Sequence, residues 1–213
     1  MLPRPNRGSL GNRSRKLADC SRSAHGQSSV QRRVRGILFI DYVRMLRGEK
    51  SVDWTPYLSP EDLVYLSKKI EEKEWYPMET FERFGIAILK VVARGQLEGV
   101  RMWGGFQVVS VLKLFPELLA PGEPRESLMR FRVLADSFFD YGALRVVSVV
   151  DDHAVVSVAY GMSPIAEEAA STQTLGFFER LVELAGGSAI HARFTSRSWA
   201  GDAGTLIELN WSV

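Results

Sequence analysis

The sequence predicts an α+β fold, in which an N-terminal helical block packs on a four-stranded antiparallel sheet. Apolar residues recur at helical spacings as far as about Phe139, and the period changes to two after Tyr141-Gly142. Two pairs of alternating segments then flank one long helical segment, which indicates the order strand–strand–helix–strand–strand. We therefore expect a single domain over residues 30–213, with a helical part at 30–140 and a sheet part at 141–213.

The first 29 residues differ in charge from the rest of the chain. They carry six basic residues and one acid, whereas residues 30–213 carry 21 basic and 24 acidic residues. Residues 1–29 also have few large apolar side chains, which predicts a disordered basic tail. A basic arm that touches nucleic acid or an acidic membrane surface is the alternative, and a transit peptide is another. The acidic balance of residues 30–213 argues against a nucleic-acid partner of the domain.

The cysteine count and the hydropathy pattern indicate in which cellular compartment the protein is located. The single cysteine, Cys20, can form neither an internal disulfide nor a structural zinc site. No run of about 18 apolar residues predicts a transmembrane segment. The N-terminus lacks the apolar segment of a secretory signal. These observations predict a cytoplasmic protein.

The helical block contains several recognisable starts and stops. A first helical pattern begins at Val30 and ends near Gly48. Ser59-Pro60-Glu61-Asp62 predicts the start of the next helix, with a serine cap, a proline in the first turn and two acids at the positive end of the dipole. Pro77 predicts a further helix that runs to about Ala93.

The next segment, residues 97–119, is apolar over most of its circumference, which is typical of a central helix. Gly85 in the preceding helix and Gly104-Gly105 in this segment indicate close helix packing or a bend. A last helix of the block is expected at about 125–139.

The sheet part begins with two β segments, 144–150 and 154–160, joined by a short turn at 151–153. Ser163-Pro164 predicts the start of a long helix, which Gly186-Gly187 ends. Alternating apolar and polar residues then predict strands over 190–195 and 206–213. The long helix should pack on one face of the sheet.

Four local features carry a resemblance over about residues 30–213. They are Trp75-Tyr76-Pro77 before a helix, Phe139-Asp140-Tyr141-Gly142 before the first strand, the helix that ends in Gly186-Gly187, and the last strand with Asn210-Trp211. With these features the chain resembles the superfamily of haem nitric-oxide-binding (H-NOX) domains, 4-vinyl reductase domains and small TRAPP subunits. It is similar in particular to a bacterial, myxobacterial-type paralogous family of unknown function related to that superfamily.

The resemblance implies binding of haem, zinc or an acyl chain, but the residues that bind these groups in the related proteins are missing from this chain. Haem-binding members have an axial histidine on a helix of the α/β part and a Tyr-x-Ser-x-Arg element that holds the propionates. The histidines of this chain are expected in the tail (His25), in a turn (His153) and on a strand (His191), and the segment 65–69, Tyr-Leu-Ser-Lys-Lys, ends in lysine. Zinc-carrying and acylated members use cysteines that the domain lacks. We therefore predict no haem, no metal and no other cofactor.

No pattern of residues indicates a catalytic site. The Gly-x-Ser-x-Gly, P-loop, dinucleotide-binding and His-Glu-x-x-His motifs do not occur. Asp151, Asp152 and His153 could form a metal or acid–base cluster, although these residue types are also common in turns. The sequence predicts a protein that is not an enzyme. A buried and paired His153 or His191 would favour the enzyme alternative.

Two groups of aromatic residues are candidate binding sites. In the related fold a cavity can open between the helical part and the sheet, and the candidate ligand-pocket residues are Trp103, Phe106, Phe138 and Tyr141, with Phe139 beside them. The alternative is that these side chains only fill the core. The candidate interface residues, expected as an exposed aromatic patch, are Trp54, Tyr57, Trp75 and Tyr76.

These observations predict a non-enzymatic regulatory or scaffold module in signalling, which acts through protein–protein contacts or self-association. The alternative is a sensor domain that binds an apolar small molecule or lipid in a cleft between the helices and the sheet.

Overall fold

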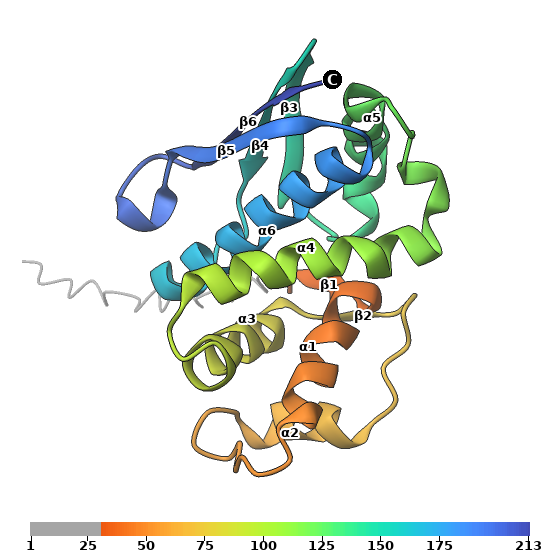
Figure 1. The fold of residues 1–213 in the computed structure, drawn as a ribbon. Helices are drawn as coiled ribbons and strands as arrows, with labels where there is room; N and C mark the ends of the chain where they lie inside the picture. Colours follow the sequence, from red (N-terminus) through yellow and green to blue (C-terminus); the bar gives the residue numbers. More distant parts are fainter. Residues whose placement is uncertain (1–30) are drawn as a thin grey trace, which may run out of the picture. The chain divides into compact units, whose positions relative to one another are not determined.

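The computed structural model describes residues 31–213 (Figure 1). The predicted basic tail, residues 1–29, lies outside the described residues. The helices are α1 (Gly36–Gly48), α2 (Pro60–Ser67), α3 (Met78–Ala87), α4 (Leu97–Leu114), α5 (Pro124–Leu134) and α6 (Pro164–Leu184). The strands are β1 (Arg33–Arg35), β2 (Trp75–Pro77), β3 (Leu144–Val150), β4 (His153–Val158), β5 (Ser188–Ser196) and β6 (Thr205–Ser212).

The four C-terminal strands form one antiparallel sheet in the order β3-β4-β6-β5. The helix α6 lies between β4 and β5 in the chain and packs against β5 and β6, while α5 packs against β3 (Figure 1). Buried side chains such as Val156, Ile207 and Leu209 form the face under these helices. The predicted α+β fold and the order strand–strand–helix–strand–strand are therefore confirmed. No helix among residues 31–213 has the length and hydropathy needed to cross a membrane.

The beginning of the domain differs from the sequence-based expectation. Residues 33–35 are not helical but form β1, which pairs antiparallel with β2, with Val34 opposite Tyr76. Asp140 holds this segment, because its Oδ1 accepts a hydrogen bond from the Arg33 backbone N at 2.8 Å and its Oδ2 one from Arg33 Nε at 2.7 Å. The helical spacing near Val34 is thus misleading, since partners distant in the chain keep this segment extended.

The helix starts follow the local signals. Ser59 Oγ accepts a hydrogen bond from the Asp62 backbone N at 3.3 Å, and Asp62 Oδ2 accepts one from the Ser59 backbone N at 3.1 Å. This reciprocal capping box begins α2 as predicted. Pro77 directly precedes α3, which continues through a π-helical turn at Ile88–Val92. Both predicted helix starts are therefore confirmed. Each depends only on residues close to it in the chain, which the sequence shows directly.

Glycines allow α4 and α6 to lie with their backbones in contact (Figure 1). A Cβ atom on Gly104 would stand 1.9 Å from the carbonyl oxygen of Gln173, and one on Gly176 would stand 1.9 Å from that of Arg101. The close packing predicted from Gly104-Gly105 is therefore confirmed. This crossing brings two buried glutamines, Gln107 of α4 and Gln173 of α6, together in the interior.

Candidate functional site

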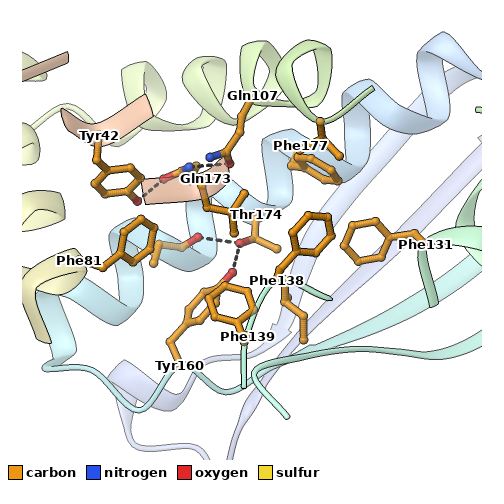
Figure 2. Close-up of a pocket in the computed structure, with 14 residues that line it drawn as sticks. Tyr42, Phe81, Gln107, Phe131, Phe138, Phe139, Tyr160, Gln173, Thr174 and Phe177 are labelled. Carbon is orange, nitrogen blue, oxygen red and sulfur yellow. Dashed lines mark hydrogen bonds between the residues drawn. The ribbon is translucent and has the colours of Figure 1, made fainter. Parts of the chain in front are cut away.

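A cavity of about 40 Å³ lies between the helical part and the sheet part (Figure 2). Its wall is mostly apolar and includes Phe81 of α3, Phe131 of α5, Phe138, Phe139 and Phe177 of α6. The free volume corresponds to about three water molecules, since one water needs about 10–15 Å³ by this measure. The cavity is therefore much smaller than the sites of roughly 300–1,000 Å³ that hold drug-sized ligands and cofactors.

A chain of buried polar groups interrupts this apolar wall. Tyr42 Oη of α1 donates a hydrogen bond to Gln173 Oε1 at 2.6 Å, and Gln173 Nε2 donates one to Gln107 Oε1 at 2.8 Å (Figure 2). The chain ends at Gln107 Nε2, which is buried and has no hydrogen-bond partner among the described residues. An unpaired buried donor costs about 1–3 kcal/mol, so a bound acceptor atom would relieve a real penalty at this point.

One polar atom of Gln107 has no hydrogen-bond partner in either orientation of the two side-chain amides. If both amides are turned over, Gln173 donates to Tyr42 and Gln107 donates to Gln173, so the chain of hydrogen bonds reverses its direction and the unpaired atom of Gln107 is the acceptor Oε1 instead of the donor Nε2. One polar atom of Gln107 then still lacks a partner. A polar atom of a small molecule in the cavity would complete the chain in either orientation.

A second polar pair lies across the cavity. The hydroxyl groups of Tyr160 and Thr174 are 2.6 Å apart, and Thr174 Oγ1 donates to the carbonyl oxygen of Ala170 at 2.8 Å (Figure 2). Burial raises the pKa of both Tyr160 and Tyr42, so these hydroxyls remain protonated at neutral pH. They can act as hydrogen-bonding groups in the wall but carry no charge.

The segment before α6 is held by a buried carboxylate. Glu167 accepts hydrogen bonds from the backbone N of Tyr160 at 3.1 Å and from that of Met162 at 2.9 Å. Both carboxylate oxygens are therefore occupied by backbone donors. Glu167 thereby fixes the position of Tyr160 in the cavity wall.

Two further hollows adjoin the cavity. A smaller cavity of about 20 Å³ shares Tyr42, Phe81 and Gln173 with the first, so the hydrogen-bonded Tyr42–Gln173 pair stands between the two. A surface groove of about 340 Å³ lies along α1 and α4. Gln107 lines both this groove and the first cavity, so its side chain separates the cavity from the surface.

The structure places the four predicted pocket residues at different sites. Phe138 lines the first cavity, whereas Trp103 lines the smaller cavity and the groove. Phe106 does not line either cavity, because it is on the outer side of α4 and is 68% exposed. Tyr141 Oη donates to the carbonyl oxygen of Tyr160 at 3.1 Å, outside the cavity wall.

Sequence reasoning missed the polar half of the site. Tyr42, Gln107, Gln173 and Thr174 were not among the candidates, although they supply its hydrogen-bonding groups. A detectable signal exists: Gln107 is a polar residue that lies between the apolar residues Phe106 and Val108 in the middle of a mostly apolar segment, and the structure buries it. Such a residue usually has a partner, and the partner here is 66 residues away.

The four predicted interface residues do not form one exposed patch. Trp54 is only 7% exposed, and its Nε1 donates to the carbonyl oxygen of Leu46 at 3.1 Å, so the expectation is wrong for this residue. Tyr76 is half-buried and stacks on Phe39 with ring centroids 4.5 Å apart. Trp75 is half-buried under the guanidinium group of Arg35, and Tyr57 is exposed. A partner at Tyr57, Trp75 or Tyr76 stays a prediction.

The residues around the cavity do not fit a haem group. The wall contains no histidine or cysteine, and the cavity is far too small. His153 and His191 face away from it, since they lie in one row with Asn210 on the sheet face opposite the buried residues. None of the six tyrosines is followed by serine two and arginine four positions later. Residues 31–213 also contain no cluster of three or more side chains suited to a metal ion.

Comparisons with known proteins agree with the fold. No protein-family model matches the chain, and no curated protein matches it. Among solved structures, it is similar to an oxygen-binding H-NOX domain related to soluble guanylate cyclases, solved as the oxygen complex, with a TM-score of 0.57 and 14% identity over 84% of this chain and 95% of that one.

Two further solved structures show the same likeness. An S. oneidensis H-NOX protein in the Fe(II)NO ligation state has a TM-score of 0.57 and 10% identity, with 84% of this chain and 99% of that one covered. A mutant of the T. tengcongensis H-NOX domain has a TM-score of 0.56 and 13% identity, with 84% and 98% covered. At these identities the comparison establishes an H-NOX-like α+β fold, and the fold alone does not carry a function.

Proposed function

We propose that this chain is a non-enzymatic sensor domain that binds a small apolar molecule in the cavity between its helices and its sheet. The observation that carries the proposal is the unpaired Nε2 of Gln107 in a mostly apolar wall. The fold supports the same class of function, because the similar solved structures include an oxygen complex and a nitric-oxide-ligated form of H-NOX proteins.

The cavity limits the size and the chemistry of the ligand. Its volume of about 40 Å³ suits a molecule of about three heavy atoms, which excludes a lipid chain or a haem in this arrangement of side chains. The aromatic wall favours an apolar body, and in the amide orientation of the structure the unpaired Gln107 Nε2 favours one hydrogen-bond acceptor. The ligand class is therefore a small, mostly apolar molecule with a single acceptor atom, bound without haem.

The polar chain offers a physical route from ligand to conformation. Tyr42, Gln173 and Gln107 belong to α1, α6 and α4, so one line of hydrogen bonds ties three helices together. A ligand that accepts a hydrogen bond from Gln107 stabilises the arrangement in which this side chain faces the cavity. The ligand can shift the population of conformations only by its difference in affinity for them.

A pair of probes of the same size tests this site. Dimethyl ether and propane each have three heavy atoms, but only the ether has an acceptor. We expect both gases to shift the backbone amide NMR signals around Ala170 and Thr174, which line the cavity. The preference for ether over propane should fall in Gln107→Leu, because that variant lacks the donor.

Two matched alanine variants provide the control. Ala170 lines both cavities, whereas Ala166 lines only the smaller one. Ala170→Val should abolish the response to both gases, and Ala166→Val, with the same added volume in the same helix, should keep it. No signal shift in the native protein, or an equal response in the two variants, would exclude the cavity as the ligand site.

We also propose that the domain acts by protein–protein contact as a regulatory module, because the outer side of α4 carries the exposed side chains Met102 and Phe106. The single cysteine of the chain supports a reducing, cytoplasmic location for this role.

A further inference from the structure

The outer side of α4 carries a row of exposed side chains. Glu98, Met102, Phe106, Val109 and Lys113 follow one another at intervals of four, four, three and four residues, so they share one helix face. Met102 is 60% exposed, Phe106 68% and Val109 43%. The opposite side of α4 is covered, because Gly104 packs there against α6 (Figure 1). We call these five residues the outer α4 stripe.

The outer α4 stripe has an acid at one end and a base at the other. Glu98 and Lys113 form no ion pair among the described residues, and about 22 Å of helix separates them. When two such helices lie antiparallel, Glu98 of each faces Lys113 of the other, and Met102 faces Val109. The stripe is therefore complementary to a second copy of itself across a two-fold axis, as an isologous interface requires.

The groove beside the stripe supplies a seat for an aromatic anchor. Phe106 lies at the middle of the stripe and forms one wall of this groove, together with Met45, Trp103 and Gln107. Asp41, Arg44 and Ser110 complete the lining, so the groove has an apolar and a polar side. In the antiparallel arrangement the second copy's Phe106 lies close to the two-fold axis and can enter this groove. Large aromatic side chains that fill a pocket near the centre of an interface commonly contribute most of the binding energy.

We propose that the outer α4 stripe is the interface of a symmetric homodimer with antiparallel α4 helices. This proposal names a second copy of the chain as the partner in the protein–protein contact proposed above, and it does not depend on the sensor function. One helix face with its groove is smaller than a standard stable interface, so we expect a weak dimer with a Kd of roughly 10–100 µM.

Sedimentation equilibrium between micromolar and millimolar protein tests the interface. Phe106→Glu should raise the dimer Kd at least about tenfold. The matched control is Val133→Glu, which places the same charge on another exposed apolar position, 83% exposed on α5, and should leave the Kd unchanged. A native protein that stays monomeric at millimolar concentration, or equal effects of the two substitutions, would overturn the proposal.

Charge reversal tests the antiparallel orientation. Glu98→Lys and Lys113→Glu should each raise the Kd by roughly tenfold at low ionic strength, because each places like charges opposite one another twice in the dimer. The double variant should recover the native Kd. A mixture of the two single variants should form the heterodimer in preference to either homodimer, since all four charges then pair.

Two further measurements on the same variants test for a general loss of structure. Circular dichroism and thermal melting should be the same for the native protein and all these variants, because the substituted side chains are on the surface. If the double variant is no better than the single ones while all are folded, the antiparallel pairing is wrong.

Discussion

At the scale of single residues, Asp62 shows how one side chain can serve two structures. It completes the capping box of α2 and also accepts hydrogen bonds from Arg83 of α3, at 2.5 Å from Nε and 2.8 Å from Nη2. Burial alone would raise the pKa of Asp62, but the hydrogen bonds from Arg83, Thr80 and Ser59 together hold this pKa below the usual value of an aspartate. The carboxylate is thus ionised in the folded protein over most of the pH range.

We predict that Asp62→Asn lowers the free energy of unfolding by about 2–3 kcal/mol at pH 7. Because the folded pKa lies below the unfolded value, the carboxylate contributes its full stability above about pH 4. This contribution is lost as the pH falls through the folded pKa. Urea unfolding from pH 7 to pH 2.5 should therefore show the native protein and the variant converging at the acid end.

The exposed pair Glu126–Arg130 on α5 is the control for this prediction. Glu126→Gln removes a carboxylate from a surface ion pair and should cost about 0.5 kcal/mol or less. A constant difference between the native protein and Asp62→Asn down to pH 2.5 would contradict the assigned role of the carboxylate.

At the scale of elements, the contact between α4 and α6 is decided by glycine. We predict that Gly104→Ala destabilises the protein by about 2–4 kcal/mol, because the added methyl group would overlap the Gln173 carbonyl and push the helices apart. Chemical denaturation measures this loss. An unchanged stability would mean that the two helices are not in backbone contact.

The neighbouring Gly105 separates this packing effect from helix propensity. A Cβ atom there would be 3.5 Å from the nearest side-chain atom, an ordinary contact. Gly105→Ala should therefore stabilise the protein by about 0.5–1 kcal/mol, since alanine favours the helix more than glycine does.

The hydrogen bond between Tyr42 and Gln173 joins α1 to α6. Tyr42→Phe should cost about 1–2 kcal/mol of unfolding free energy, because it leaves the buried Gln173 Oε1 without a partner. Tyr65→Phe is the matched control, since the half-buried Tyr65 hydroxyl has no hydrogen-bond partner among residues 31–213. Thermal or urea unfolding should show the loss in the first variant alone, and equal losses would argue against a role for the polar chain.

At the scale of the whole molecule, the H-NOX-like fold is present without a site that fits haem. We predict that added haem produces no saturable Soret band at one equivalent, because the cavity is small and its wall has no histidine or cysteine. An absorbance titration measures this, with a haem-binding H-NOX domain as the positive control. A saturable band at one-to-one stoichiometry would show that the core opens to admit the cofactor.

Much of the fold could be predicted because its signals are local. The capping box at Ser59, the proline that begins α6 and the change of period after Tyr141 each depend on a few neighbouring residues. They yielded the helix starts, the strand alternation and the α+β class. The pairing of β1 with β2 could not be predicted in this way, because some 40 residues separate the two strands.

The sequence by itself determined the α+β class, the main helices and strands, and the close packing at Gly104, since local patterns dictate each of them. Only the tertiary structure decided which side of the apolar helix α4 faces inward. That choice, made by the contact with α6, turns Gln107 towards Gln173 and the cavity and leaves Phe106 exposed. Tyr42 and Gln173 meet across 131 residues of chain, and no local pattern specifies such a contact. The physical reason is that a helix apolar on nearly all sides has no preferred buried face until a neighbouring helix packs against it.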